Sequence, residues 1–176
     1  MLEYGNRSAV KNYSVKDVNS NVLVTFEVNS FHGIQSPFAD IWDWFDGILI
    51  KVQSDDEGGI STCYVTDEPA KFSSTDFSQY RELGSVPRAE NWIKAIYDGE
   101  AGDIICKSIP GSSSSYYCDY YWGLNLPTSG VSLRGVPFGG RADHGSRCGF
   151  LCAHSAAVPG HVNPHLGSRL CAFPSP

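Results

Sequence analysis

The segment Arg134–Arg169, RGVPFGGRADHGSRCGFLCAHSAAVPGHVNPHLGSR, is unusual for the residue types that it lacks. It holds four of the five histidines of the 176-residue chain, but no Lys, Glu, Gln, Met or Trp. These five types occur 21 times in residues 1–122 and never in residues 123–176, where the same frequency would give about nine. They are the amino acids that no codon ending in a pyrimidine encodes, so the absence indicates a segment written in such codons.

The order of residues within the segment fits neither a helix nor a strand. Apolar, cationic, anionic and thiol residues follow one another in RADHGSRCGFLC and GHVNPHL without a period of 2 or 3.6, so we expect loops. Two explanations of the missing types stay open. Either the segment is diversified through its codons, or it is a Gly/Pro-rich loop that lost large charged residues by chance. The absence also covers residues 123–140, which have the character of ordinary scaffold.

Length and composition predict one globular domain. The chain is 41% hydrophobic, 12% aromatic and 18% charged, with many glycines and prolines, which favours short strands and turns. The net charge of −6 divides into −9 over residues 1–122 and +3 over residues 123–176, which argues against a nucleic-acid surface. No apolar run approaches the about 20 residues of a spanning helix, and the first residues lack a signal peptide's apolar core, so we expect no membrane insertion.

The clustered histidines and the six cysteines raise the question of a metal site. The cysteines form no CxxC pair and no zinc-finger spacing, so we expect free thiols. His161 and His165 have the i, i+4 spacing of helical zinc sites. Pro164 between them and Gly160 before them disfavour the helix that would aim both rings at one ion. We therefore expect no metal and no other cofactor.

Apolar periodicity predicts an α+β domain with short early helices and strands throughout. Residues 1–21 are expected to form an extended arm or a connection to an upstream part, and residues 22–176 a single domain. Strands are expected at 22–28, 48–52, 60–66, 103–109, 116–122, 131–134 and 166–173, and helices at 38–45, 74–83 and 88–97.

Two groups of carboxylates raise the question of a binding or catalytic site. Phe38, Ile41, Trp42 and Phe45 have helical spacing, which would turn the Asp residues of ADIWDWFD to solvent rather than toward a sugar or a general acid/base role. The stretch SDDEGG lacks the alternating oxygen ligands of a calcium loop, so we expect an acidic hairpin turn.

The residues that bracket the unusual segment give it a resemblance. With SLRGVPFGG before it and LGSRLCAF after it, the C-terminus resembles the variable region of a diversity-generating retroelement target protein. Such proteins have the formylglycine-generating-enzyme branch of the C-type lectin fold, in which an R-G-G-like strand start and a G-F-R-like strand bracket the binding loops. The counterparts here are Arg134-Gly135 with Gly139-Gly140, and Gly167-Ser168-Arg169, where Ser168 departs from the pattern. Upstream, SFHGIQSPFADIWDWFDGI and YYWGLN resemble structural proteins of gut Bacteroidales phages and prophages, so the resemblance covers about residues 31–173.

The resemblance implies a C-type lectin-like fold with a mixed or antiparallel sheet, long C-terminal binding loops and a variable region at about 141–166. In the family, a reverse transcriptase copies a template with errors at adenines, so that Asn codons become any-any-pyrimidine codons. The residues expected to vary and to contact ligand are Arg141, Asp143, His144, Ser146, Arg147, Cys148, Leu151, Cys152, His154, Ala156, Ala157, His161, Val162, Asn163, His165 and Leu166. The residues expected to be scaffold are Trp122 in the core, Arg134, Gly139, Gly140, Gly167 and Arg169.

The function implied is binding without catalysis. The chain would be a phage tail-tip or tail-fibre adhesin, located on the virion or on a bacterial surface. Its partners would be a bacterial surface protein or glycan, other tail proteins and further copies of itself. The alternative is a cysteine oxidase of the formylglycine-generating type using Cys148 and Cys152, although residues four apart on a strand lie about 13 Å from each other.

Overall fold

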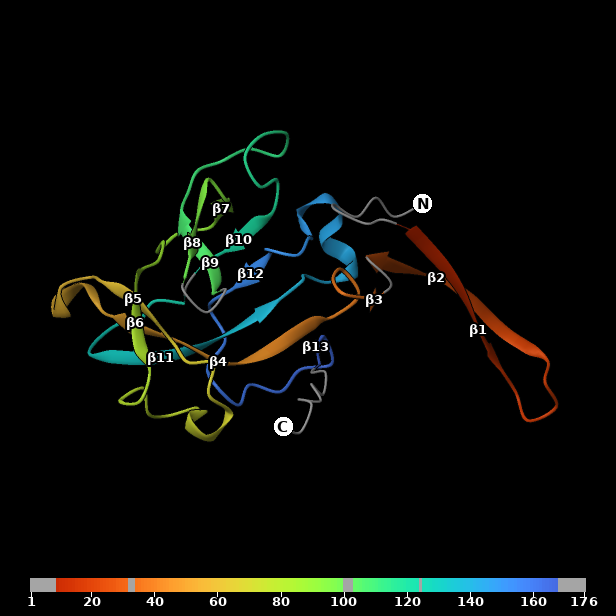
Figure 1. The fold of residues 1–176 in the computed structure, drawn as a ribbon, viewed down its shortest axis with the longest axis horizontal. Helices are drawn as coiled ribbons and strands as arrows, with labels where there is room; N and C mark the ends of the chain where they lie inside the picture. The colour runs from red at the N-terminus through yellow and green to blue at the C-terminus, as the bar shows by residue number, and fades with distance from the viewer. Residues whose placement is uncertain (1–8, 32–33, 100–102, 124, 168–176) are drawn as a thin grey trace.

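The computed structural model describes residues 9–31, 34–99, 103–123 and 125–167, and these residues form mostly β-sheet (Figure 1). The main sheet has eight strands in the order β6-β5-β4-β11-β12-β10-β7, with β13 also paired to β4. The pairs β10–β12 and β4–β13 are parallel, whereas the others are antiparallel, so the sheet is mixed. Its strands are β4 (Trp42–Gln53), β5 (Ser61–Val65), β6 (Arg81–Ser85), β7 (Asn91–Trp92), β10 (Tyr120–Trp122), β11 (Val131–Phe138), β12 (Ala153–His154) and β13 (Leu166–Gly167).

The long strands β4 and β11 lie side by side near the middle of the sheet, and their register slips once. Gly135 of β11 pairs with Leu49, but the next residue, Val136, pairs with Phe45. Three residues of β4 therefore have no counterpart in β11, and Gly47 among them has a φ of 82°, in the left-handed region that favours glycine. The slip lets the first half of β4 pair with β13 while the second half pairs with β5.

The core is built from the sheet and from a separate hairpin of β8 (Ala95–Asp98) and β9 (Ile104–Ser108). Ile50, Val52, Val65, Tyr121 and Ile105 are each at most 2% exposed. Burying an aliphatic side chain of this size stabilises a fold by about 1.5–3 kcal/mol. The strands that carry the C-terminal segment are thus anchored in a well-filled interior.

An N-terminal hairpin projects from this body (Figure 1). It consists of β1 (Ala9–Lys16) and β2 (Val22–Phe31), with the short β3 (Ile34–Gln35) beside β2. Val24 and Phe26 on one face of β2 are 51% and 47% exposed, so this face is apolar and open to solvent. Of the expected arm, residues 9–16 form β1, paired with β2, and residues 1–8 lie outside the described residues.

The three expected helices were wrong. Residues 38–45 are bends followed by the start of β4, residues 74–83 are turns leading into β6, and residues 88–97 contain β7 and the start of β8. Trp42 is 5% exposed whereas Phe45 is 53% exposed, so the apolar residues at helical spacing do not share one buried face. The helices of the described ranges are three short 3₁₀ segments, η1 (Asp55–Glu57), η2 (Pro69–Lys71) and η3 (Ala142–Arg147).

The strand predictions were more accurate. The expected strands 22–28, 48–52, 60–66, 103–109 and 131–134 correspond to β2, β4, β5, β9 and β11, and β11 continues to Phe138. Of the strand expected at 116–122 only β10 forms, and of that at 166–173 only β13 lies within the described residues. Among the described residues, no helix has the length and apolar character needed to span a bilayer.

Candidate functional site

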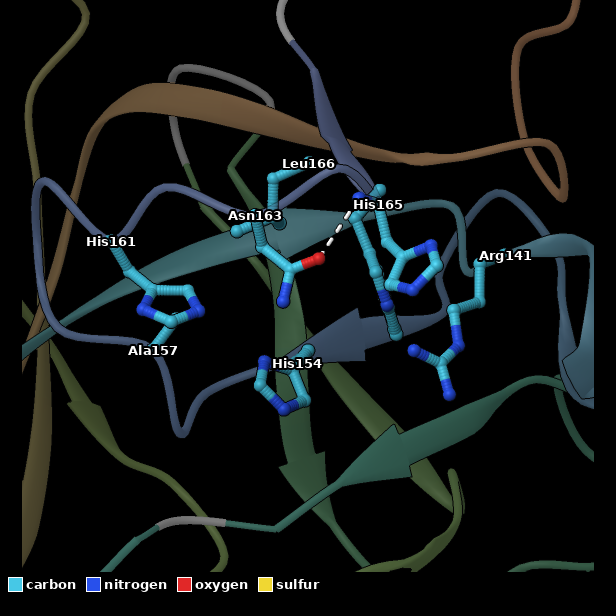
Figure 2. Close-up of a pocket in the computed structure, with 8 residues that line it drawn as sticks. Arg141, His154, Ala157, His161, Asn163, His165 and Leu166 are labelled. Atoms are coloured by element: carbon cyan, nitrogen blue, oxygen red, sulfur yellow. Dashed lines mark hydrogen bonds between the residues drawn. The ribbon is translucent and has the colours of Figure 1, made fainter.

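A pocket of about 180 Å³ opens where the C-terminal segment crosses the start of β4 (Figure 2). Trp42 forms part of its wall. Its other lining residues all belong to the set expected to contact ligand: Arg141, His154, Ala157, His161, Asn163, His165 and Leu166. The fold thus brings to one place residues that are up to 25 positions apart in the segment, and Figure 2 shows their side chains arranged around a common space.

The segment that lines the pocket is attached to the sheet mainly through its main chain. The N–H of Trp42 donates to the carbonyl of His165 at 2.8 Å. The N–H of Gly135 in β11 donates to the carbonyl of Ala157 at 2.9 Å. Within the segment, β12 pairs with β10 and β11, and β13 pairs with β4. Such bonds do not depend on which side chain the residue carries, so they fix the path of the segment for many sequences.

The two glycines that open the segment are required by the backbone. Gly139 and Gly140 have φ values of 94° and 82°, in the left-handed region. A Cβ atom on Gly140 would lie 2.5 Å from the sulfur of Cys148. At the other end, a Cβ on Gly167 would lie 2.4 Å from the side chain of Ile41. The glycines expected to be scaffold therefore occupy positions where a larger residue is strained or obstructed.

An aromatic cluster supports the pocket from the side of η3. The ring of His144 stacks on Trp122, with centroids 4.3 Å apart, and meets Trp42 edge-on at 5.5 Å. His154 packs on the same indole of Trp42 at 5.4 Å. The guanidinium of Arg147 lies 5.5 Å from the Trp122 ring centroid. Trp122 was expected in the core; it is half-buried, and its ring serves as a platform for the segment.

The ionisable groups around the pocket include a paired arginine and two histidines that burial shifts toward the neutral form. Arg141 pairs through Nε with the carboxylate of Asp143 at 2.7 Å. Burial, aided by the neighbouring His144, His161 and Arg141, lowers the pKa of His154 to about 4, so this ring is neutral at pH 7. Burial also lowers the pKa of His144. Arg141 is thus the one permanent charge among the lining residues.

The two cysteines of the segment lie beneath the surface. Cys148 and Cys152 were expected to contact ligand, and both are 0% exposed, so their side chains do not reach the surface in this structure. Burial raises the pKa of Cys148 to about 12 and that of Cys152 well above its ordinary value. A thiol that stays protonated is a poor nucleophile and a poor metal ligand. No three His, Cys, Asp or Glu side chains of the described residues are grouped so that they could hold a metal ion.

A buried carboxylate anchors the same part of the segment. Asp119, 1% exposed, precedes β10 and accepts a hydrogen bond from the N–H of Leu151 at 2.7 Å. Its other oxygen would lie 1.9 Å from a Cβ atom on Gly149. Burial raises the pKa of Asp119 to about 6. The sequence did not point to Asp119, because this single acidic residue in the stretch YYCDYYW belongs to no motif.

The remaining expected contact residues divide by exposure. Asp143, Ser146, Arg147, His161, Val162 and His165 are exposed, Arg141, His144, Leu151, His154, Ala156, Asn163 and Leu166 are half-buried, and Ala157 is buried at 7% exposure. Ala153 and Ser155, which were not expected to contact ligand, are fully buried. Arg134 is 6% exposed and donates to the carbonyl of Asn125 at 2.7 Å, whereas Arg169 lies outside the described residues.

A second, wider hollow of about 360 Å³ lies next to the first. It is formed by the irregular part of β4, including Trp44 and Phe45, and by the turn that carries His161 and Val162. His161 lines both hollows. The sequence predicted a helix over residues 38–45 and therefore gave no indication of this surface; the only available signal was the density of aromatic residues in IWDWF.

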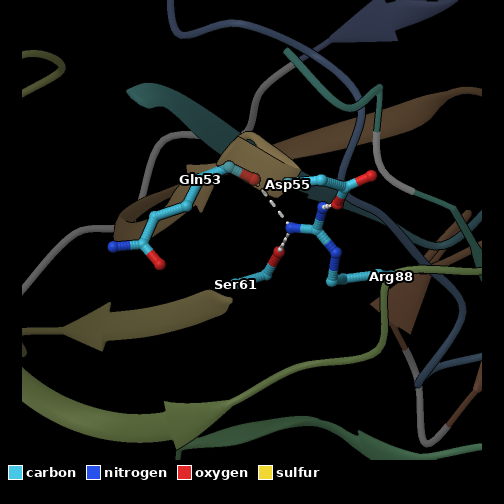
Figure 3. A network of polar contacts seen from close by, with 4 residues as sticks. All are labelled: Gln53, Asp55, Ser61 and Arg88. Atoms are coloured by element: carbon cyan, nitrogen blue, oxygen red, sulfur yellow. Dashed lines mark hydrogen bonds and ion pairs between the residues drawn. The ribbon is translucent and has the colours of Figure 1, made fainter. Parts of the chain in front are cut away.

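A polar cluster around Arg88 has a structural role (Figure 3). Arg88 donates to the carbonyl of Gln53 at 2.8 Å and to the hydroxyl of Ser61 at 3.2 Å. It also pairs with the carboxylate of Asp55 at 2.7 Å. The stretch SDDEGG is the turn between β4 and β5, as predicted, and Arg88 fastens it to the segment before β7.

No protein-family model, curated protein or solved structure matches this chain. The case for its function therefore rests on its own residues and their arrangement.

Proposed function

We propose that this chain is a hypervariable ligand-binding protein, a phage tail-tip or tail-fibre adhesin whose C-terminal segment is diversified by a retroelement. In this proposal its fold is C-type lectin-like, and residues 141–166 display the variable surface. The ligand is a bacterial surface protein or glycan. The chain is carried on the virion or on a bacterial surface, together with other tail proteins or further copies of itself.

The observation that supports the proposal most is the division between main chain and side chain in the segment. The main chain is bonded to β4, β10 and β11, while the side chains of exposed residues such as His161 and His165 line the pocket. Exposed substitutions usually shift stability by about half a kcal/mol or less. A segment held in this way tolerates many side chains without losing its path, which is what diversification requires.

The missing residue types support the same proposal from the coding side. Pyrimidine-ending codons explain why a segment with four histidines, three arginines between 134 and 147, and two buried thiols contains no Lys, Glu, Gln, Met or Trp. The burial and raised pKa of both thiols give the oxidase alternative no support. The exposed apolar face of β2 is the surface that we assign to contact with other tail proteins or further copies.

A library experiment tests the proposal. Arg141, His161, Asn163 and His165 are replaced together by the residues of any-any-pyrimidine codons, and the matched control library changes Ala153 and Ser155 in the same way. We expect most members of the first library to fold and most of the second to fail, measured by protease resistance on a display system. Equal failure of both libraries would contradict a tolerant binding surface.

The neighbouring DNA provides an independent test. A near-repeat of the coding sequence for this segment, with adenines where this copy has other bases, should lie beside a reverse transcriptase gene. Its absence from the source genome would refute the retroelement part of the proposal.

A further inference from the structure

The pocket beside Trp42 has a composition that selects one kind of ligand. Of its eight lining residues, Arg141 is the one with a permanent charge, and none carries a carboxylate. The pairing of Arg141 with Asp143 uses Nε, and its two terminal nitrogens have no partner among the described residues. A guanidinium in this position is suited to a planar oxyanion, which it holds through two parallel hydrogen bonds.

The other polar groups of the pocket both donate and accept. His154 is held in its neutral form by burial, and a neutral imidazole has one N–H donor and one nitrogen acceptor. The amide of Asn163 accepts a hydrogen bond from the N–H of His165 at 3.0 Å through Oδ1, while its nitrogen faces the open space in Figure 2. A bare carboxylate needs donors only. Groups that offer both functions match hydroxyls, which also donate and accept.

The size of the pocket limits the ligand further. At about 180 Å³ it is smaller than the about 300–1,000 Å³ of pockets for drug-sized molecules, so it accommodates a group the size of one sugar ring. Trp42, Ala157 and Leu166 supply apolar wall on which the carbon face of such a ring can pack.

We propose that this pocket binds a single sugar ring bearing a carboxylate, such as a terminal or side-branch uronic acid of a bacterial surface polysaccharide. The inference rests on the receptor-binding function proposed above and names the class of receptor that this copy of the segment recognises. Arg141 holds the carboxylate, while His154, His161 and Asn163 bond the ring hydroxyls. A segment with other side chains at these positions would recognise a different group.

Titration of the ¹⁵N-labelled chain with methyl β-D-glucuronide tests the proposal. Its 14 non-hydrogen atoms at the efficiency of ordinary ligands correspond to a Kd of about 1 mM. We expect saturable shifts of the amide signals of the lining residues. The uncharged methyl β-D-glucoside should bind about tenfold more weakly, because it lacks the group that Arg141 holds.

Two matched variants locate the site. Arg141→Gln should weaken glucuronide binding about tenfold, whereas Lys94→Gln, which also removes a positive charge but at an exposed position outside the pocket and outside residues 141–166, should leave it unchanged. The amide spectrum of each variant reports whether it is folded. His161→Ala, at an exposed position, serves as a second pocket variant and should weaken binding about fivefold.

Three results would overturn the inference. They are an absence of saturable shifts with glucuronide, equal binding of glucoside, or equal binding of N-acetylglutamate amide, which would indicate an acidic protein side chain as the ligand. In each case, binding of the intact chain to bacterial cells that is altered by substitutions in residues 141–166 would leave the receptor-binding function standing. If one of these three results is found and the substitutions also leave binding to cells unchanged, both the sugar-binding inference and the receptor-binding function are refuted.

Discussion

Asp119 offers a direct measurement of what it costs to hold the C-terminal segment in place. The carboxyl is 1% exposed, and burial raises its pKa from 3.8 to about 6. A pKa difference of this size means that folding favours the protonated form of the carboxyl over the ionised form by a free energy of about 3 kcal/mol. The native state binds the proton more tightly than the unfolded chain does, so this group stabilises the fold fully below about pH 4 and loses that contribution as the pH rises through about 6.

The substitution Asp119→Asn removes the ionisation but keeps an oxygen that can accept the hydrogen bond from Leu151. We expect the free energy of unfolding of the variant, relative to the wild type, to rise by about 2–3 kcal/mol between about pH 4 and about pH 7. At low pH the variant should be equal to the wild type or slightly less stable, since both then carry a neutral group. Urea denaturation followed by tryptophan fluorescence at a series of pH values measures this difference.

The comparison must be made between variant and wild type because His154 acts in the opposite direction. Its pKa falls from 6.5 to about 4 on folding, so its contribution is present above about pH 6.5 and is lost as the pH falls toward 4. The two groups partly cancel in the wild-type profile. The difference between the two proteins removes every group except Asp119, and a difference that does not change with pH would refute a buried, proton-binding carboxyl at this position.

Three further predictions follow from other contacts. Arg88→Ala should lower the free energy of unfolding by about 1–3 kcal/mol, because it leaves the acceptors in Figure 3 without their donor; an unchanged urea midpoint would contradict this role. Iodoacetamide should label half-buried Cys118 in the native protein but leave Cys148 unmodified until urea is added, as read by mass spectrometry; native labelling of Cys148 would argue against its burial. Gly149→Ala should cost about 3 kcal/mol or prevent folding, because its Cβ would overlap the Asp119 carboxyl; a variant with wild-type stability would show that this contact can relax.

The success of the sequence in predicting strands and its failure with the helix at 38–45 have one cause. Apolar and polar residues alternate clearly in Val22–Val28 and Ile60–Thr66. In these stretches β2 pairs with β1, and β5 pairs with β4 and β6, always antiparallel. In β4 the period is broken by the register slip at Gly135, and the strand changes partners along its length. Its partners β11 and β13 lie about 80 and about 120 residues further along the chain, so local spacing carried no information about them.

The residues that line the pocket could be predicted from the sequence, but how far each side chain is buried could not. The bias against five residue types marks the segment as a whole, and it led to seven of the eight lining residues. It says nothing about which side chains point inward, so it placed Cys148 and Cys152 among the contacts. Trp42 was missed as a wall of the pocket because the residues that it meets there, His154, His165 and Leu166, come from more than 100 positions away.

If the segment is diversified as proposed, burial limits which of its positions can vary. A pyrimidine-ending codon at the position of Cys152 would often specify Asp, Arg, Asn or His, and burying such a group without a partner costs several kcal/mol. Small domains have only about 5–15 kcal/mol of stability, so two or three such changes would unfold the protein. Variation at every position of the segment would therefore unfold most variants of the protein. We therefore expect a variable set smaller than the codon bias suggests, concentrated on exposed and half-buried positions such as Arg141, His161 and His165. Cys148 and Cys152 would be restricted to small apolar residues.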